Sequence, residues 1–304
     1  MRKYIEDEKS KVLCDLQKNR NLLLFCPIGA FYSNKINKFF MLLSYIFKHI
    51  YHRLFKRKLY DVDFFYDMNE DVTYKKDIGD DKIVVYTCVV GEYDTIKEPL
   101  YINPNIDYIV VTDLDVREDS AWRKIDIANL KLPSNMTASQ KNRYVKMHPH
   151  LIFPEYEYSI YIDGSIRVVA DIIPLVYSMG TACFLGMHNH PVRRKISTEC
   201  NAVLFSKKNV DEKILKKQVS NYYKQGYDDS YGILEGTVIV RKHNNSECID
   251  LMNDWWDEMK TYPTRDQISL PYVLWKRKVS NKLIHRFPGC VFTNYRISWE
   301  KHLK

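Results

Sequence analysis

Residues 82–94 read KIVVYTCVVGEYD, and this stretch decides the fold class. A nearly unbroken apolar run that ends at Gly91 is typical of a strand buried on both faces. A second run, DYIVVTD at 107–113, ends in Asp113. Strands of this kind belong to sheets that helices cover on both sides. The two runs therefore predict an α/β domain with a mixed, mostly parallel sheet flanked by helices.

The rest of the chain alternates between strand-like and helix-like segments, as a parallel sheet requires. Residues 137–149 read as a helix with Thr137 as its N-cap, and YSIYIDGSIRVV (158–169) reads as two strands broken at Asp163-Gly164. We expect further strands at 122–127, 181–188 and 236–242, and further helices at 208–225, 246–260 and 265–278. Ligands of such sheets bind beyond the carboxyl ends of the strands, so polar residues there are the candidates for a site.

The positive charge of the chain is concentrated in one segment. The net charge is +8, and residues 35–58 carry seven Lys and Arg and no acid. The nearly neutral remainder excludes a uniformly basic nucleic-acid-binding protein. The segment is too interrupted to span a membrane, but its apolar side chains share one helical face. Such a helix can lie on an anionic membrane surface; the alternative is a helix packed on the main domain.

Composition divides the chain into three parts: a helical basic extension (1–58), an acidic connector (59–81) and the α/β domain (82–304). The first eleven residues contain acids where a signal peptide needs an apolar run. The seven cysteines include no CxxC pair, which favours reduced thiols over a disulfide framework or a zinc ribbon. We therefore expect a cytoplasmic protein, at the inner face of the cytoplasmic membrane if the basic segment binds there.

Two groups of residues suit a diphosphate-bearing ligand. The turn in YIDGSI exposes Asp163, and one carboxylate there can hold a divalent cation that bridges two phosphates. A plain hairpin turn is the alternative. Arg143 and Lys146 lie three residues apart on one face of the expected helix, which either faces a diphosphate or is simply solvated.

Three other groups suit a sugar or its acceptor. The segment GMHNHPVRRKISTEC (186–200) is dense in histidine, arginine and acid, and Glu235 precedes a strand between two glycines. Asp266-Gln267 opens a helix, where an aspartate is also ordinary capping chemistry. Trp255 can stack on a sugar face or belong to the core.

Taken in order, these blocks resemble a known family over roughly residues 82–300. The ordered set is KIVVYTCVVGEYD, DYIVVTD, SAW, KNRYVKMHPH, YSIYIDGSI, HPVRR, LEGTVIVRKHN, WWDEM and TRDQISLPYVLWK. It is similar to the glycosyltransferase-like domain of bacterial polysaccharide loci and of plant TOD/MUCI-like proteins. The resemblance implies a GT-A fold and a hexosyltransferase-like enzyme of cell-surface polysaccharide synthesis, such as capsule or lipopolysaccharide. Its donor would be a nucleotide-diphosphate sugar and its acceptor a glycan or lipid-linked glycan.

The resemblance also implies Mn²⁺ or Mg²⁺, with one departure. Asp163-Gly164-Ser165 stands where such enzymes carry Asp-x-Asp, so Ser165 removes one carboxylate of the usual metal clamp. A site built from Asp163, a histidine and water stays open, and so does metal-independent donor binding. A non-catalytic glycan- or membrane-binding module is the rival interpretation. Phosphotransfer is disfavoured because the chain has no Gly-rich phosphate loop.

Site roles follow from the resemblance by position. The expected metal ligand is Asp163, and the expected catalytic residues are Asp266, Gln267 and Glu235. The Asp-Gln pair resembles that of some retaining GT-A enzymes and favours retention, whereas inversion follows if Asp266 acts as a general base. The expected donor-binding residues are Val89, Gly91, Tyr93, Asp113, Arg143, Lys146, Asp163, Gly164 and Ser165. The expected acceptor-binding residues are His190, Arg193, Glu199 and Trp255.

Overall fold

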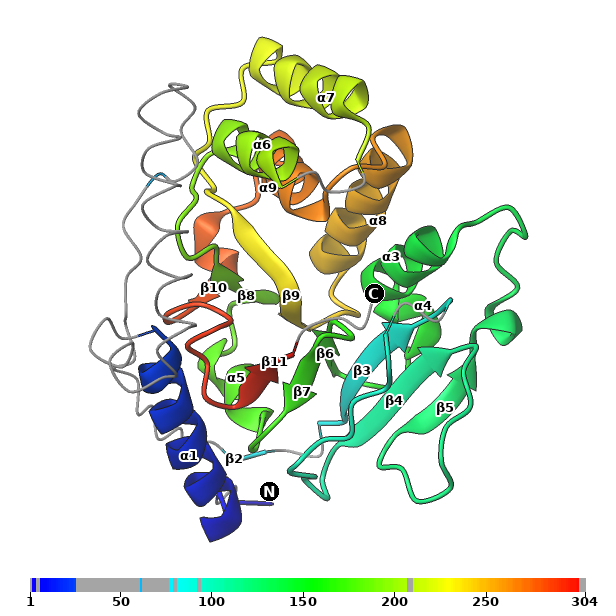
Figure 1. Cartoon of the computed structure of the whole chain (residues 1–304), viewed down its shortest axis with the longest axis vertical. Helices are drawn as coiled ribbons and strands as arrows, with labels where there is room; N and C mark the ends of the chain where they lie inside the picture. The colour runs from blue at the N-terminus through cyan, green and yellow to red at the C-terminus, as the bar shows by residue number, and fades with distance from the viewer. Residues whose placement is uncertain are drawn as a thin grey trace, which may run out of the picture.

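The computed structural model describes residues 2–3, 6–25, 61, 77–78, 81–91, 94–206 and 210–300. In this part of the chain the central element is a seven-stranded sheet in the order β10-β8-β9-β6-β3-β4-β5 (Figure 1). Its strands are β3 (Ile83–Val89), β4 (Asp107–Thr112), β5 (Arg123–Asp126), β6 (Tyr158–Ile162), β8 (Leu185–Asn189), β9 (Leu234–Arg241) and β10 (Ile284–Phe287). Only β9 runs antiparallel to its neighbours in this sheet. The predicted α/β class with a mostly parallel sheet is confirmed.

The two apolar runs that predicted the sheet lie at its centre. β3 is buried at every position, and β4 at every position but its first. They pair in parallel from Val84 with Asp107 to Val89 with Thr112. Their carboxyl ends are therefore level, and β6, on the other side of β3, ends two residues earlier at the same edge.

Helices cover one face of the sheet, and a helix with a short ribbon covers the other. Val84 and Tyr86 point into the first core, and Ile83 and Val85 into the second, as the two-residue period of a strand requires. The first face packs against α3 (Ala138–Met147), α6 (Ile196–Phe205), α7 (Glu212–Lys224), α8 (Ser246–Thr261) and α9 (Asp266–Lys276). The second packs against α5 (Ile173–Ser178) and the antiparallel pair β7 (Ile166–Val168) and β11 (Ile297–Trp299).

Short elements complete the described chain. They are η2 (Ile127–Leu130), α4 (Pro149–Ile152), η3 (Asn281–Leu283) and the pair β1 (Arg2–Lys3) and β2 (Asp77–Ile78). Helix α1 (Glu8–Phe25) docks on the main domain through its N-terminal end, where Glu6 accepts a hydrogen bond from Arg296 Nη1 at 2.8 Å. Ser10 Oγ accepts from the backbone N–H of Asp171 at 2.8 Å.

The predicted membrane-surface segment, residues 35–58, lies outside the described residues, as does nearly all of the predicted connector 59–81. Among the helices that are described, none is long and apolar enough to cross a membrane. The proposed boundaries at 58 and 81 stay predictions.

Candidate functional site

Helix α3 carries the central cation of the site. Thr137 and Gln140 form a capping box at its N-terminus, which confirms the predicted N-cap. Nine residues later, the Lys146 side chain is only 3% exposed. The Lys146 carbonyl accepts hydrogen bonds from Tyr86 Oη at 3.0 Å and Arg241 Nη1 at 2.7 Å. The last turn of α3 is thereby tied to β3 and β9.

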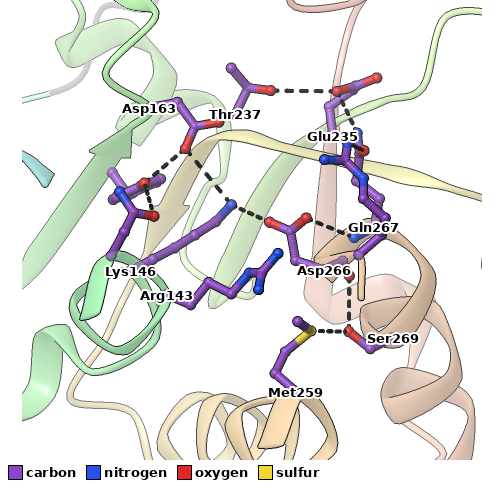
Figure 2. Close-up of polar contacts among 12 residues, drawn as sticks. Arg143, Lys146, Asp163, Glu235, Thr237, Met259, Asp266, Gln267 and Ser269 are labelled. Carbon is purple, nitrogen blue, oxygen red and sulfur yellow. Dashed lines mark hydrogen bonds and ion pairs between the residues drawn. The ribbon is translucent and has the colours of Figure 1, made fainter. Parts of the chain in front are cut away.

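The ammonium of Lys146 lies between two carboxylates from distant parts of the chain. Its Nζ is 2.5 Å from Asp266 Oδ2 and 3.9 Å from Asp163 Oδ1 (Figure 2). Asp163 follows β6 directly, and its Oδ1 accepts from Tyr161 Oη at 2.8 Å. Its backbone N–H donates to the carbonyl of Thr237 on β9 at 2.9 Å. The exposed turn predicted from YIDGSI is thus one wall of a charged cluster.

A glycine makes the close approach possible. A Cβ on Gly236 would lie 2.8 Å from Lys146 Nζ and 3.1 Å from Asp266 Oδ2, closer than carbon packs against these atoms. Here β9 is irregular, because its pairing with β8 shifts from Met187–Ile239 to His188–Glu235. Irregularities of this kind often lie beside active sites, where they re-aim side chains.

Asp266 stays ionised although it is largely buried. Burial opposes its charge, but Lys146, Arg265 and Arg143 outweigh burial and hold its pKa well below the usual range. Its Oδ1 accepts from the backbone N–H of Gln267 at 3.1 Å. The result is a fixed negative charge at the first turn of α9.

Glu235 is the opposite case. Burial, followed by the charge of nearby Glu199, raises the pKa of Glu235 to about 7. Its Oε2 accepts from Gln267 Nε2 at 2.8 Å, and Gln267 Oε1 accepts from Arg265 Nη2 at 2.7 Å. Its Oε1 lies 3.5 Å from His190 Nε2. Asp266 therefore keeps a permanent negative charge, whereas Glu235 titrates near neutrality.

The segment after β8 completes this second group. His190 Nδ1 accepts from the backbone N–H groups of Val192 and Arg193 at 3.2 and 3.0 Å, which places the ring proton on Nε2. That nitrogen faces Glu235 and lies 3.9 Å from Glu199 Oε2. Arg193 Nε in turn pairs with Glu199 Oε2 at 2.5 Å. The structure thus brings together three of the four residues expected to bind an acceptor.

With this geometry in view, comparison with known proteins is informative. The sequence model of the "TOD1/MUCI70, glycosyltransferase-like domain" matches residues 65–301, most of the chain. The chain belongs to this family. The predicted resemblance is therefore confirmed, and the match begins inside the segment predicted as a connector.

A curated relative of this TOD1/MUCI70 domain is the "Probable hexosyltransferase MUCI70" of Arabidopsis thaliana, 24% identical over 246 residues. The match covers 70% of this chain and 41% of the relative, so the chain spans about two fifths of that protein's length.

Three solved structures are similar in outline. The bifunctional glycosyltransferase WbbM, without ligand, has a TM-score of 0.44 and 13% identity, covering 70% of this chain and 40% of that one. Mouse xyloside xylosyltransferase 1 has a TM-score of 0.40 and 11% identity, covering 74% and 96%. An active-site mutant of LgtC has a TM-score of 0.40 and 11% identity, covering 72% and 86%.

The other expected donor-binding residues that the structure describes lie at the same edge of the sheet. The backbone N–H of Gly91, which has a φ of 72°, donates to Asp113 Oδ1 at 3.1 Å. Val89 is buried, and its carbonyl accepts a hydrogen bond from Thr112 Oγ1 at 2.5 Å. Tyr93 lies outside the described residues. Gly164 accepts from Lys97 Nζ at 2.7 Å through its carbonyl.

The expectation that Trp255 binds an acceptor is wrong. Its side chain is 0% exposed, so it has no free face on which a sugar could stack. Its indole N–H donates to Ser269 Oγ at 3.0 Å. The ring lies below the site, with Lys146 Nζ 5.9 Å from its centroid. Trp255 therefore belongs to the core, which was the alternative to stacking on a sugar.

The residues around Asp163 do not fit a resident Mn²⁺ or Mg²⁺. Such ions need several oxygen ligands, yet Asp163 Oδ1 already accepts from Tyr161 and lies 3.9 Å from an ammonium. A cation bound to Asp163 would lie near the Lys146 ammonium and would be repelled by it. Ser165 stands where the resemblance implies a second carboxylate, and the described residues include no group of three His, Cys, Asp or Glu able to hold a metal.

Sequence reasoning missed two residues of the site. Arg265 precedes Asp266 and bonds Gln267; its position beside the Asp-Gln pair was the available signal. Lys97 bridges the turn of Asp163 to the loop after β3, because its Nζ also lies 2.7 Å from Asp94 Oδ1. Nothing in the pattern of the sequence around Lys97 distinguishes it from a surface lysine.

Proposed function

We propose that this domain transfers a hexosyl group from a nucleotide-diphosphate sugar to a hydroxyl group of a glycan or lipid-linked glycan. The observation that carries the proposal is the Lys146–Asp266–Asp163 cluster at the carboxyl edge of a parallel sheet. There, cations and a permanent carboxylate lie side by side. The family's glycosyltransferase-like description and the hexosyltransferase name of the Arabidopsis relative support the same reaction class.

The reaction breaks the bond between the anomeric carbon and the diphosphate oxygen, and forms one between that carbon and the acceptor oxygen. The leaving diphosphate gains negative charge, which Lys146 and Arg143 would stabilise. The sugar gains positive charge, which the ionised Asp266 would stabilise from close by. The acceptor proton leaves with the diphosphate or with a protein base.

Retention is the favoured stereochemistry. The depressed pKa of Asp266 makes it a weak general base, since efficient bases titrate near the working pH. A fixed charge under the anomeric carbon, with the diphosphate taking the acceptor proton, leads to retention. The competing base is Glu235, whose pKa is about 7; if it accepts the proton on the opposite face, the product is inverted.

The second candidate function is a glycan-binding module that has lost its chemistry. Ser165 in place of the second carboxylate of Asp-x-Asp favours it. Such a module would bind glycan equally well with and without nucleotide. A catalytic domain would bind the nucleotide itself.

The cellular setting belongs to the proposal as well. We place the domain in the cytoplasm, on the inner face of the cytoplasmic membrane, acting in cell-surface polysaccharide synthesis such as capsule or lipopolysaccharide. The seven cations of residues 35–58 are the support for the membrane contact.

The test is a panel of UDP, GDP and CMP sugars offered to the full chain, with nucleotide release measured. We expect one donor to be turned over, and NMR of the product to report the donor's own anomeric configuration. An inverted product would assign the base to Glu235. No turnover with any donor, together with no nucleotide binding by calorimetry, would leave the glycan-binding module as the function.

A further inference from the structure

Arg265 is a cation of the site that has few partners of its own. It is the N-cap residue of α9. Its Nη2 donates to Gln267 Oε1 at 2.7 Å, while its Nε is buried and has no hydrogen-bond partner. A guanidinium has five N–H donors in a rigid fork that matches phosphate. Apart from the bond to Gln267, the guanidinium makes no hydrogen bond with the described residues.

The charge of Arg265 acts on the whole cluster. Burial raises the pKa of Asp163 and of Glu235, and the charge of Arg265 opposes that rise. At Asp266 the charge of Arg265 adds to that of Lys146 in holding the pKa low against burial. Arg265 directly precedes Asp266, whose Oδ2 lies 2.5 Å from Lys146 Nζ, so it lies beside this cluster. Arg143 adds a third cation, held by a hydrogen bond from its Nη2 to the Thr264 carbonyl at 2.8 Å.

The cation between the carboxylates is built into the core. Lys146 Nζ lies 5.2 Å from the ring centroid of Tyr161 and 5.9 Å from that of Trp255. An ammonium has three donors, and the described contacts of Lys146 Nζ are with Asp266 and Asp163. Ser165 removes one negative charge from the place where Asp-x-Asp would carry it. Three cations thus face Asp163, Asp266 and Glu235, and the pKa of Glu235 is about 7, so it carries only part of a charge at neutral pH. The resulting excess of positive charge suits an anionic ligand.

We propose that Arg265 and Lys146 together bind the donor's diphosphate in place of a divalent metal ion, so that donor binding is metal-independent. This inference rests on the proposed function. Arg265 contacts the diphosphate with N–H groups that do not bond Gln267, and Lys146 contributes an N–H of its ammonium that does not bond Asp266. The side chains of Arg265 and Lys146 supply the positive charge that Mn²⁺ or Mg²⁺ would otherwise supply.

The experiment is isothermal calorimetry of the full chain with UDP, GDP, ADP and CDP, in EDTA and again in Mn²⁺. We expect the dissociation constant of the preferred nucleotide to agree within about twofold between the two conditions. Arg265→Met should weaken binding by at least about tenfold, as the loss of a charge-assisted pair does, and Arg265→Lys should restore part of it. Lys146→Met should weaken it similarly.

Arg277→Met is the matched control, because Arg277 lies at the other end of α9 and pairs with Asp250 and Asp254 on the surface. It should bind nucleotide like the wild type. Binding that EDTA abolishes and Mn²⁺ restores would overturn the proposal while leaving the proposed function intact, as would normal binding by Arg265→Met. No nucleotide binding in either condition would overturn both.

Discussion

Gly236 is the residue on which the geometry of the site depends most directly. It lies on β9, where any side chain would enter the space shared by Lys146 Nζ and Asp266 Oδ2. Both atoms are ends of side chains, so the backbone need not move to admit a methyl group. The cost of a substitution therefore falls on the ion pair rather than on the fold.

We predict that Gly236→Ala lowers kcat/KM by at least about tenfold, because displacements of about 1 Å in a reacting constellation are costly. The free energy of unfolding should change by less than about 1 kcal/mol, since alanine also restricts the unfolded chain. Steady-state kinetics and urea unfolding of the same preparation measure the two effects. Wild-type kinetics would mean that the Lys146–Asp266 pair lies outside the chemistry.

The titration of Glu235 makes the free energy of unfolding depend on pH, and substituting this one residue isolates the effect. Burial and Glu199 raise its pKa from 4.5 to about 7. Between these values the folded protein holds a proton that the unfolded chain has lost, so this contribution to stability falls as pH rises and is level above the folded pKa. One group with this shift accounts for at most about 3 kcal/mol.

We predict that Glu235→Gln is stabilised relative to the wild type by about 1–3 kcal/mol more at about pH 8 than at about pH 5. Glutamine has no proton to lose, while its carbonyl can still accept from Gln267. Urea unfolding of both proteins across this range is the measurement. A difference that does not change with pH would show that Glu235 titrates normally.

At the scale of elements, the position of α3 depends on a buried arginine without an acidic partner among the described residues. Arg241 is fully buried. It donates to the Lys146 carbonyl and, from Nη2, to Tyr86 Oη at 2.5 Å. Tyr86 also donates to the same carbonyl. Without the guanidinium, the Lys146 carbonyl would still accept the hydrogen bond from Tyr86 but would lose the one from Arg241.

We predict that Arg241→Met changes the free energy of unfolding by no more than about 1 kcal/mol, because an unpaired buried charge gains little from burial. The affinity for nucleotide should nevertheless fall several-fold, since Lys146 loses one of the bonds that orient its turn. Thermal unfolding and calorimetry measure the two quantities. A large loss of stability with unchanged affinity would assign Arg241 to the fold alone.

The strands and helices with one clear period were predictable, and those defined by distant partners were not. β3, β4, β6 and α3 follow from their own sequences. Helix α6 was missed, because HPVRRKISTEC reads as a polar loop. The residues just before its first turn are held from far away by the Asp61 carboxylate, which accepts from the backbone N–H groups of Arg194 and Lys195 at 2.7 and 2.9 Å.

The same reason limits what could be predicted of the site. Asp163, Lys146 and Asp266 were each identified, since each follows a strand or faces one side of a helix. Their convergence was not, because Lys146 and Asp266 are 120 residues apart in sequence and meet only where Gly236 gives them room. The burial of Trp255 could not be predicted from the sequence either, because a tryptophan on a helix can point into the core or into a binding site.

At the scale of the whole molecule, the N-terminal extension contributes an ion-pair partner to a buried residue of the main domain. Arg296 is buried with Glu6 as its ion-pair partner, so deleting the extension would leave a buried cation unpaired. The membrane prediction for residues 35–58 therefore calls for substitutions rather than truncation.

We predict that changing Lys56, Arg57 and Lys58 to glutamine weakens binding to phosphatidylserine-containing vesicles roughly hundredfold, at about 1 kcal/mol for each charge. Co-sedimentation measures it. The matched control changes Lys213, Lys216 and Lys217, three exposed lysines of α7, and should bind as the wild type does. Equal binding by both variants would contradict the membrane-surface helix.

The central claim, that the cluster around Lys146 and Asp266 binds the donor, is tested most directly by a crystal structure of the full chain with its preferred nucleotide sugar in the presence of EDTA. The account predicts diphosphate oxygens within hydrogen-bonding distance of Lys146 Nζ and the Arg265 guanidinium, with the anomeric carbon beside Asp266. A nucleotide bound elsewhere on the sheet edge, or a diphosphate that contacts neither cation, would contradict it.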